Sequence, residues 1–366
     1  MMKVTVLMTV YNGGRFLRQA VESVLAQSYS DFEFLIVDDA SSDGSLEIIK
    51  AYQDPRIRII QNSLNKGQTA SLNIGLREAR GEFIARIDAD DIALPRWLEY
   101  QTRVARNGPE NAVISSRVGV INENGFVKQL LDIPQTHEGM VLRSLTASPV
   151  NHGGSLIKRE VILQYGGYDE SFRILADYDL WIRLLHGGVR FSSGKDVLMA
   201  VRFHEGSISK AEKNRAVAEE TKKVFRRNIA FLTHRELLDR DLMLLWELCY
   251  GVDTMLFQDM EEAVILLRTI YGGLSLENIG SVGIMRHWQE RVKVFFAKKI
   301  FTCLSAGDRL GVLEACRRYE QHCGRSFMTA LFRCLSFLGS FGKMTPRLFN
   351  FRRRLGAVLA LRYVHL

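Results

Sequence analysis

Residues 88–91, Asp-Ala-Asp-Asp, place three carboxylates within one short segment. Three negative charges so close together repel one another unless a cation offsets them. Carboxylate oxygens are ligands that Mg²⁺ and Mn²⁺ prefer, and diphosphate oxygens can complete the coordination. The segment is therefore a candidate site for a divalent metal and a diphosphate. The alternative is a solvated acidic turn that caps the helix expected after Pro95.

A second acidic pair, Asp38-Asp39, ends the apolar segment 32–37. A carboxylate in this place can accept a hydrogen bond from a nucleobase imide N–H or from a ribose hydroxyl. The alternative is an N-cap for the helix that begins near Gly44, although Asp43 could serve as that cap and leave Asp39 free.

Two more side chains suit a nucleotide. Tyr11 follows the first apolar segment and offers an aromatic face on which a base can stack, although ordinary packing at a strand end explains it equally well. Lys66 precedes a helix expected from Gln68, and a helix start beside a cation favours an anionic group such as a phosphate. The alternative for Lys66 is a turn with a solvated side chain.

A third acidic position, Asp177, opens a segment in which Leu180, Trp181 and Leu184 recur at helical spacing. Burial of these apolar side chains would hold the carboxylate in place, and a positioned carboxylate at the mouth of a site can act as a general base. The alternative is an N-cap. Further on, Arg202 and His204 end another apolar segment, and either could meet a diphosphate or a metal; a purely structural histidine is the alternative.

The elements that must position these residues alternate along the first hundred residues. Strands are expected over 3–9, 32–37, 57–61 and 83–87, with helices between them over 14–27, up to about 52, and 68–79. This alternation predicts an α/β fold with a mostly parallel, Rossmann-like sheet flanked by helices. Ligands bind at the carboxyl ends of such strands, where the acidic segments lie.

The rest of the chain differs in pattern. Strands are expected over 113–117, 155–158 and 197–203, and a helix over 177–186. From residue 211 the pattern is helical with little strand signal. We therefore expect two domains: an α/β domain over residues 1–210 and an α-helical C-terminal extension over residues 211–366.

Composition excludes several classes of protein. The 366 residues are 47% hydrophobic and 25% charged, which is a globular balance and neither disordered nor collagen-like. No apolar run reaches the roughly 18 residues of a spanning helix, and residues 1–14 lack the features of a secretory signal. The cysteines do not follow zinc-site spacing, so we expect reduced thiols in a cytoplasmic protein.

The net charge of +8 is unevenly distributed. Residues 1–210 hold 24 basic and 25 acidic residues, whereas residues 211–366 hold 25 and 16, and residues 321–366 hold 8 basic residues and no acidic one. A basic tail beside the amphipathic segment 327–341 suits an anionic membrane surface. The alternative is a core-packing helix followed by a basic surface helix. Nucleic acid is not an expected partner, because the tail lacks interleaved aromatic stacking platforms.

Four segments occur in an order and at spacings that identify a family resemblance. They are VTVLMTVYNGGRFLRQAVESVLAQSYSDFEFLIVDDASSDGS, NKGQTASLNIGLREARGEFIARIDADD, GGYDESFRILADYDLWIRL and VRFHEGSIS. Over about residues 3–210 the chain resembles family-2 glycosyltransferases, which have the nucleotide-sugar-binding GT-A fold. The helical extension lies outside the resemblance.

The resemblance implies roles for individual residues on the donor side. Thr9 and Tyr11 would line the nucleotide pocket, and Asp39 would bind the base. Asp88 would face the ribose or the diphosphate, and His204 matches a position near the diphosphate.

The resemblance also implies the metal ligand and the base. Asp90 would be the main ligand of Mn²⁺ or Mg²⁺, and Asp91 would support the metal or the acceptor side. Asp177 matches the base of the family's Glu-Asp pair, but the preceding residue here is Ala176, so Asp179 is an alternative base. The reaction would be inverting, with the activated acceptor hydroxyl attacking the anomeric carbon from the face opposite the nucleotide.

The resemblance thus predicts transfer of a sugar from a nucleotide diphosphate, with UDP favoured, to a glycan or lipid-linked acceptor in bacterial surface polysaccharide synthesis. The protein would be cytoplasmic and peripheral on the inner face of the membrane. A catalytically degenerate nucleotide- or glycan-binding protein of the same fold is the alternative, supported by Ala176. A sugar nucleotidyltransferase is not expected. It would need a basic, glycine-rich phosphate loop after the first strand, and the turn at this position is YNGGRF, which has no run of basic and glycine residues.

Overall fold

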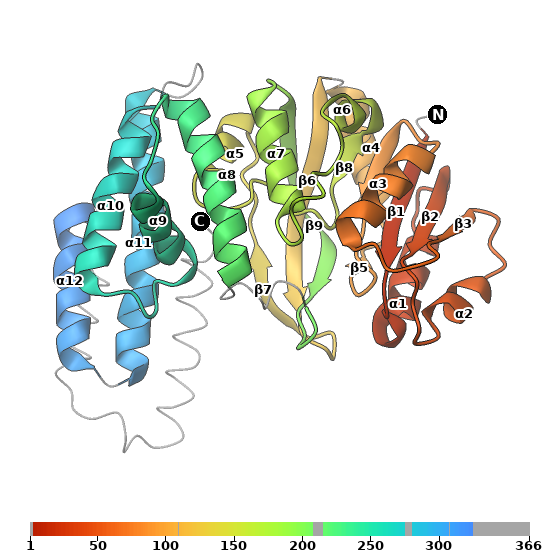
Figure 1. Ribbon diagram of the computed structural model, residues 1–366, viewed down its shortest axis with the longest axis horizontal. Helices are drawn as coiled ribbons and strands as arrows, with labels where there is room; N and C mark the ends of the chain where they lie inside the picture. The colour runs from red at the N-terminus through yellow and green to blue at the C-terminus, as the bar shows by residue number, and fades with distance from the viewer. Residues whose placement is uncertain (1–2, 109, 208–214, 275–279, 307, 325–366) are drawn as a thin grey trace. The chain divides into compact units, whose positions relative to one another are not determined.

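The computed structural model describes residues 3–108, 110–207, 215–274, 280–306 and 308–324. The chain divides into two compact units, residues 1–212 and residues 213–366. The N-terminal unit contains a β-sheet with helices packed on it, and the C-terminal unit is helical in its described part (Figure 1). The predicted α/β fold followed by a helical C-terminal region is confirmed.

The described residues form one nine-stranded mixed sheet in the order β3-β2-β1-β4-β8-β6-β9-β5, with β7 paired to β6. The strands are β1 (Val4–Val10), β2 (Phe32–Asp38), β3 (Ile57–Gln61), β4 (Phe83–Arg86), β5 (Ile92–Ala93), β6 (Asn111–Ile121), β7 (Val127–Leu131), β8 (Leu156–Lys158) and β9 (Arg190–Arg202).

Strand direction brings the ends of distant strands to one edge. Strands β1 to β4 pair in parallel, and β6 pairs in parallel with β9. Because β8 is antiparallel to both β4 and β6, these two neighbours of β8 point the same way. The carboxyl ends of β1, β2, β4, β6 and β9 therefore meet at one edge. The sheet is mostly parallel, as predicted, and β5, β7 and β8 run in the opposite direction.

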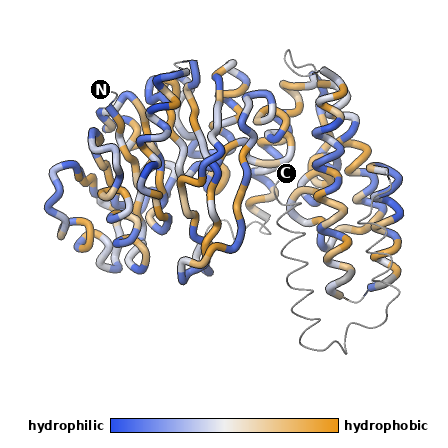
Figure 2. Tube along the Cα trace, turned by 180° about the vertical axis from the view of Figure 1, so that it is seen from behind, coloured by the Kyte–Doolittle hydropathy of each residue, from blue (hydrophilic) through white to orange (hydrophobic). Residues whose placement is uncertain are grey.

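Helices cover the sheet where its strands are apolar. Every residue of β1 is buried, as expected for a strand covered on both faces. Helix α3 (Gln68–Glu78) packs on β1 and β2. A Cβ atom on Gly75 of α3 would lie 2.3 Å from Leu7 Cδ1, so glycine permits this close approach. Figure 2 shows hydrophobic residues along the strands and hydrophilic ones in many connecting loops.

Several short elements of the N-terminal unit were not predicted from the sequence. They are β5, β7, α5 (His137–Arg143) and α6 (Arg159–Gln164). Each has seven residues or fewer, too few for periodicity to separate it from a loop. The remaining helices of this unit are α1 (Gly14–Leu25), α2 (Ser45–Lys50), α4 (Trp97–Asn107) and α7 (Ala176–His186).

The described part of the C-terminal unit consists of α8 (Arg215–Thr233), α9 (Asp239–Tyr250), α10 (Phe257–Gly272), α11 (Ser281–Ala306) and α12 (Arg309–Cys323). Helix α10 packs against α9 and α11, and α11 packs against α12. Among the described helices, none combines the length and apolar character needed to cross a membrane. The predicted amphipathic segment 327–341 and the basic residues after it lie outside the described residues.

Candidate active site

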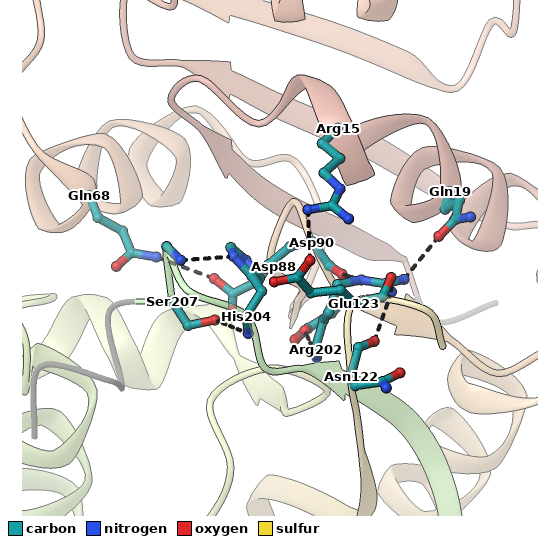
Figure 3. A network of polar contacts seen from close by, with 12 residues as sticks. Arg15, Gln19, Gln68, Asp88, Asp90, Asn122, Glu123, Arg202, His204 and Ser207 are labelled. Carbon is teal, nitrogen blue, oxygen red and sulfur yellow. Dashed lines mark hydrogen bonds and ion pairs between the residues drawn. The ribbon is translucent and has the colours of Figure 1, made fainter. Parts of the chain in front are cut away.

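The acidic segment Asp88–Asp91 follows β4 at the edge where the strand ends meet (Figure 3). It does not cap a helix, because the N-cap of α4 is Arg96 and makes no side-chain capping bond. The alternative of an acidic helix cap is therefore wrong. Two of the three carboxylates, on Asp88 and Asp90, are partly exposed, and the third, on Asp91, is buried.

Asp90 contacts a histidine that lies more than 100 residues later in the sequence of the N-terminal unit. The Asp90 Oδ2 atom lies 2.9 Å from Nε2 of His204, which follows β9. The His204 Nδ1 atom accepts a hydrogen bond from the Gly206 N–H at 3.1 Å, so the neutral ring carries its proton on Nε2 and donates it to Asp90. Burial and the nearby negative charge of Asp88 raise the pKa of Asp90.

Asp91 points into the protein. Its Oδ1 atom accepts the Arg202 N–H at 2.8 Å, and its Oδ2 atom has no hydrogen-bond partner among the described residues. Burial, followed by the charges of Asp88 and Asp90, raises the pKa of Asp91 well above its usual value. In this position Asp91 links the acidic segment to β9.

The Arg202 side chain, which is only 4% exposed, connects several segments at this edge of the sheet. Its guanidinium lies 4.4 Å from the centre of the Phe16 ring. Its nitrogens donate to the carbonyls of Asp90, Asn122 and Glu123 and to the side chain of Gln19 (Figure 3). The expectation that Arg202 could meet a diphosphate is therefore wrong, since its donors are engaged by the protein.

Asp39 sits at the end of β2 and is 2% exposed. It accepts hydrogen bonds from the Asn62 side chain at 2.7 Å and from the Lys66 and Gly67 N–H groups at 2.9 and 2.8 Å. These three bonds use three of the roughly four acceptor positions of a carboxylate. The sequence suggested that Asp39 is free. In the structure its carboxylate instead joins β2 to the loop before α3.

The other predicted nucleotide-binding residues lie beside this loop or at the end of β1. Thr9 is buried within β1, and Tyr11 follows that strand with 55% of its surface exposed. The Lys66 side chain is exposed, while its backbone N–H is held by Asp39. The N-cap of α2 is Gly44, so the suggestion that Asp43 is this cap is wrong, although Asp43 accepts the Ser45 N–H at 3.0 Å.

Asp177 lies in the first turn of α7 and is half-buried. The N-cap of α7 is Leu175, so the interpretation of Asp177 as an N-cap is wrong. Burial raises the pKa of Asp177 to about 6; the charge of Asp88 adds to the rise, while a backbone hydrogen bond at Tyr178 and the charge of Arg86 oppose it. A carboxylate with this pKa is partly protonated near neutral pH and suits proton transfer.

Asp179 has a different environment. It is buried and pairs with Arg183, whose Nε atom lies 2.7 Å from the carboxylate. Arg183 also donates from Nη1 to the Tyr165 carbonyl, and from Nη2 to the Gly167 carbonyl at 2.7 Å. This arrangement ties Asp179 to the loop after α6 and favours Asp177 as the carboxylate available to a substrate.

Sequence reasoning missed three residues between the acidic segment and Asp177. Arg86 ends β4 and pairs with Asp88, and His152 Nε2 lies 2.9 Å from the Tyr168 hydroxyl. One signal could have revealed Arg86: it is the single charged residue in the otherwise apolar run Phe83–Ile87. Tyr168 lies in the quoted segment that begins GGYDESF but received no role there, and no comparable pattern marks His152.

Comparisons with known proteins identify the family of the chain. A family model described as glycosyl transferase family 2 matches residues 5–166. The O-antigen biosynthesis glycosyltransferase WbnJ of Escherichia coli is 31% identical over 220 residues, which cover 57% of this chain and 82% of that protein. EpsE of Bacillus subtilis (strain 168), itself named as a candidate glycosyltransferase, is 36% identical over 205 residues, covering 55% and 73%.

The chain belongs to glycosyltransferase family 2. The glycosyltransferase fold extends to solved structures of low sequence identity. The crystal structure of S. aureus TarS 1–349 in complex with UDP-GlcNAc matches with a TM-score of 0.55 at 16% identity, covering 89% of this chain and 93% of that one. At such identity the match confirms the GT-A type of fold alone. The resemblance predicted from the sequence, and the prediction of a glycosyltransferase, are confirmed.

Proposed function

We propose that this family-2 enzyme is an inverting glycosyltransferase that moves a sugar from a UDP-sugar to a hydroxyl of a glycan or lipid-linked acceptor in bacterial surface polysaccharide synthesis. One observation carries the proposal: Asp177, a half-buried carboxylate with a pKa of about 6, shares a buried cation, Arg86, with Asp88 of the acidic segment. A base and a donor-binding carboxylate would therefore belong to one site.

Similar proteins support the proposed substrates. TarS was solved with UDP-GlcNAc, and the mannosyltransferase PcManGT from Pyrobaculum calidifontis, which matches with a TM-score of 0.51, was solved with GDP-Man and Mn²⁺. The name of WbnJ places that relative in O-antigen biosynthesis. UDP is the proposed nucleotide here, and GDP is the first one to test against it.

The donor-side residues fit a divalent metal. Burial and the nearby negative charge of Asp88 raise the pKa of Asp90, and a cation would relieve the repulsion between the two carboxylates. In the described part of the chain no three metal-ligating side chains converge, so diphosphate oxygens would complete the coordination. Asp90 would hold Mn²⁺ or Mg²⁺, oriented by His204. The ion, when bound, would neutralise the charge of the departing diphosphate.

On the same side, we infer the nucleotide contacts from the strand ends. Tyr11 offers its exposed ring to the base, and Thr9 lies beneath it in β1. Asp39 would use its remaining acceptor position for the base, and Lys66 would reach the diphosphate with its exposed ammonium group. Asp91 would support the metal-binding segment from within the protein.

On the acceptor side, Asp177 would remove the proton from the attacking hydroxyl. The oxygen would form a bond to the anomeric carbon while the bond from that carbon to the diphosphate oxygen breaks on the opposite face, which inverts the configuration. The proton would go to an oxygen of Asp177, and the electron pair would leave with the nucleotide. A positioned base typically contributes about 10²–10⁴-fold to the rate.

The basic C-terminal segment gives the proposed enzyme a second partner. Residues 325–366 hold 8 basic residues and no acidic one. We propose that this segment binds an anionic membrane surface, where a lipid-linked acceptor would lie. The support is the charge pattern of the sequence.

A panel of nucleotide-sugars tests the proposal. The full chain, with Mn²⁺, is incubated with UDP- and GDP-sugars, and the released nucleotide diphosphate is measured with and without glycan acceptors. We expect turnover with at least one UDP-sugar, inhibition by chelator and inversion at the anomeric carbon. Tight UDP binding without release of UDP from any donor would instead support the catalytically degenerate protein that Ala176 suggests.

A further inference from the structure

Arg86 is a fully buried cation at the end of β4, with an exposed fraction of 0%. Its Nη1 atom forms an ion pair with Asp88 Oδ2. The other two guanidinium nitrogens, Nε and Nη2, have no hydrogen-bond partner among the described residues. A buried charge is costly unless nearby groups compensate it, so the surroundings of Arg86 must carry negative charge.

The groups around Arg86 come from separate parts of the N-terminal unit. The loop after β4 supplies Asp88 and Asp91, whose charges favour the charged form of the guanidinium. Helix α7 supplies Asp177, and the loop after α6 supplies Tyr168. The loop before β8 supplies His152, whose pKa is held well below its usual value by burial and by Arg86.

Two backbone hydrogen bonds tie Arg86 to the loop before β8. Its N–H donates to the Ser155 carbonyl at 2.9 Å, and its carbonyl accepts the Gly154 N–H at 2.7 Å. The preceding Gly153 leaves room for the carboxylates, since a Cβ there would lie 3.0 Å from Asp91 Oδ2 and 3.4 Å from Asp88 Oδ2. Arg86 and both carboxylates are thus fitted against one loop.

We propose that Arg86 is a positioning residue, which fixes the Asp88 carboxylate through the ion pair and supplies the positive charge that Asp177 faces. The inference rests on the proposed function for the roles of Asp88 and Asp177. Arg86 itself is too deeply buried to touch a donor or an acceptor. It acts through the two carboxylates, one on the donor side and one on the acceptor side.

Charge and shape are separable at this position. Arg86→Gln removes the positive charge, and Arg86→Lys keeps a cation but loses the planar fork of donors. Ile84→Val is the matched control, because Ile84 is equally buried on the same strand and has no polar group. The groups that face Asp177 are Arg86 and Asp88 from the end of β4 and Tyr168 from the loop after α6. Of these, only Arg86 lowers the pKa of Asp177.

The experiment uses the full chain with Mn²⁺ and measures three quantities for each variant: the thermal unfolding midpoint, the calorimetric affinity for UDP and GDP, and kcat against pH with the donor found for the wild type. For Arg86→Gln we expect weaker nucleotide binding by about 10-fold and a kcat lower by roughly 10²-fold, the loss typical of a displaced catalytic group. The acid limb of its pH profile should move above about 6. Arg86→Lys should restore the position of the acid limb but not the full affinity.

Several outcomes overturn the inference. An Arg86→Gln variant that binds and turns over like Ile84→Val, with the same acid limb, shows that Arg86 only stabilises the fold. If Arg86→Gln does not fold, Arg86→Lys decides. An acid limb and a nucleotide affinity equal to those of the wild type show that the planar fork of donors is not needed. A shifted acid limb in Arg86→Lys contradicts the role of the positive charge. A wild type that binds nucleotide without turnover removes the proposed function, while weaker binding by Arg86→Gln still supports positioning of Asp88. A wild type that binds neither nucleotide overturns both.

Discussion

The two units of the chain bury charged side chains in different ways. In the N-terminal unit, Arg86, Asp91 and Arg202 are buried near one another at a single sheet edge. In the described helices of the C-terminal unit, the buried Lys299 donates to two backbone carbonyls, those of Asp253 and Met255, at 3.1 and 2.7 Å. Here the cation binds backbone carbonyls in the turn between α9 and α10, which have no backbone partner within the described helices.

The difference separates a functional arrangement from a structural one. At the sheet edge, burial and neighbouring carboxylates raise the pKa of Asp90 and of Asp91, and a bound cation would relieve the repulsion between the charges. Lys299 is instead held by two backbone carbonyls of the protein. We therefore expect substitutions at the sheet edge to change chemistry more than stability, and substitutions among the helices to do the reverse.

The largest effect is expected for Asp90→Ala. Loss of the proposed metal ligand should remove metal-dependent donor binding and reduce turnover by roughly 10³-fold, since a bound metal contributes several kcal/mol to charge stabilisation. The unfolding midpoint should stay within a few degrees of the wild type. Calorimetric titration with UDP and Mn²⁺, together with turnover in excess chelator, checks this. Unchanged turnover of the variant, or full wild-type activity in chelator, contradicts the metal assignment.

Asp177→Asn should lower kcat by about 10²–10⁴-fold with little change in donor affinity, because a base acts on the acceptor proton and not on the nucleotide. Asp179→Asn is the matched control, since Asp179 pairs with Arg183 and should affect stability instead. Steady-state kinetics and thermal unfolding of both variants separate the two roles. If Asp179→Asn is inactive while Asp177→Asn has normal activity, Asp179 is the base instead of Asp177.

The pH dependence of kcat follows from the same carboxylate. A general base must be deprotonated, and burial raises the pKa of Asp177 to about 6. The rate should therefore be constant above this pH and fall about 10-fold for each unit of pH below it. A kcat profile from pH 4.5 to 8, with the fold monitored at each pH, checks the prediction. A rate that stays constant down to pH 4.5 rules out Asp177 as the base.

Lys299→Met tests the other half of the comparison. The variant keeps an apolar stem of similar length but leaves the carbonyls of Asp253 and Met255 without their donor. The cost should be about 1–3 kcal/mol of unfolding free energy. Denaturant unfolding measures this cost, and kcat measured where the variant is folded should stay within about twofold of the wild type. A large loss of activity in a stable variant would remove the distinction between the units.

The smallest effect is expected from the basic segment. A basic residue near an anionic bilayer contributes about 1 kcal/mol at best. If half of the 8 face the surface, electrostatics give about 4 kcal/mol, or a dissociation constant of about 1 mM. Insertion of a few large apolar side chains would strengthen the binding. The full chain should co-sediment with anionic vesicles at low salt and detach at high salt, because salt screens exposed charges.

A chain that ends at Gly324, just after α12, is the control for the basic segment. It should stay in solution with the same vesicles, and neither chain should bind neutral ones. Equal sedimentation of the two chains, or no sedimentation of the full chain at low salt, means that the charge of residues 325–366 has another cause.

Much of the fold was predictable, because local patterns report local structure. The strands β1, β2, β3 and β4 and the helices α1 and α3 lie within a few residues of their predicted bounds. Apolar runs that end in turn-forming or acidic residues reveal where a strand ends. The short elements β5 and α6 were missed, since two to six residues carry no usable period.

By itself the sequence determined the family, the alternating strands and helices, and the acidic strand ends at Asp39 and Asp88–Asp91. Parallel strands joined by helices leave their carboxyl ends at one edge, so chain order alone brings these residues together. The tertiary structure decided the rest. Asp91 and Arg202 are 111 residues apart and meet only because β9 pairs with β6 and β5. Arg86 becomes a shared counter-charge only when β8, α6 and α7 enclose it, and no spacing within one segment encodes contacts between segments.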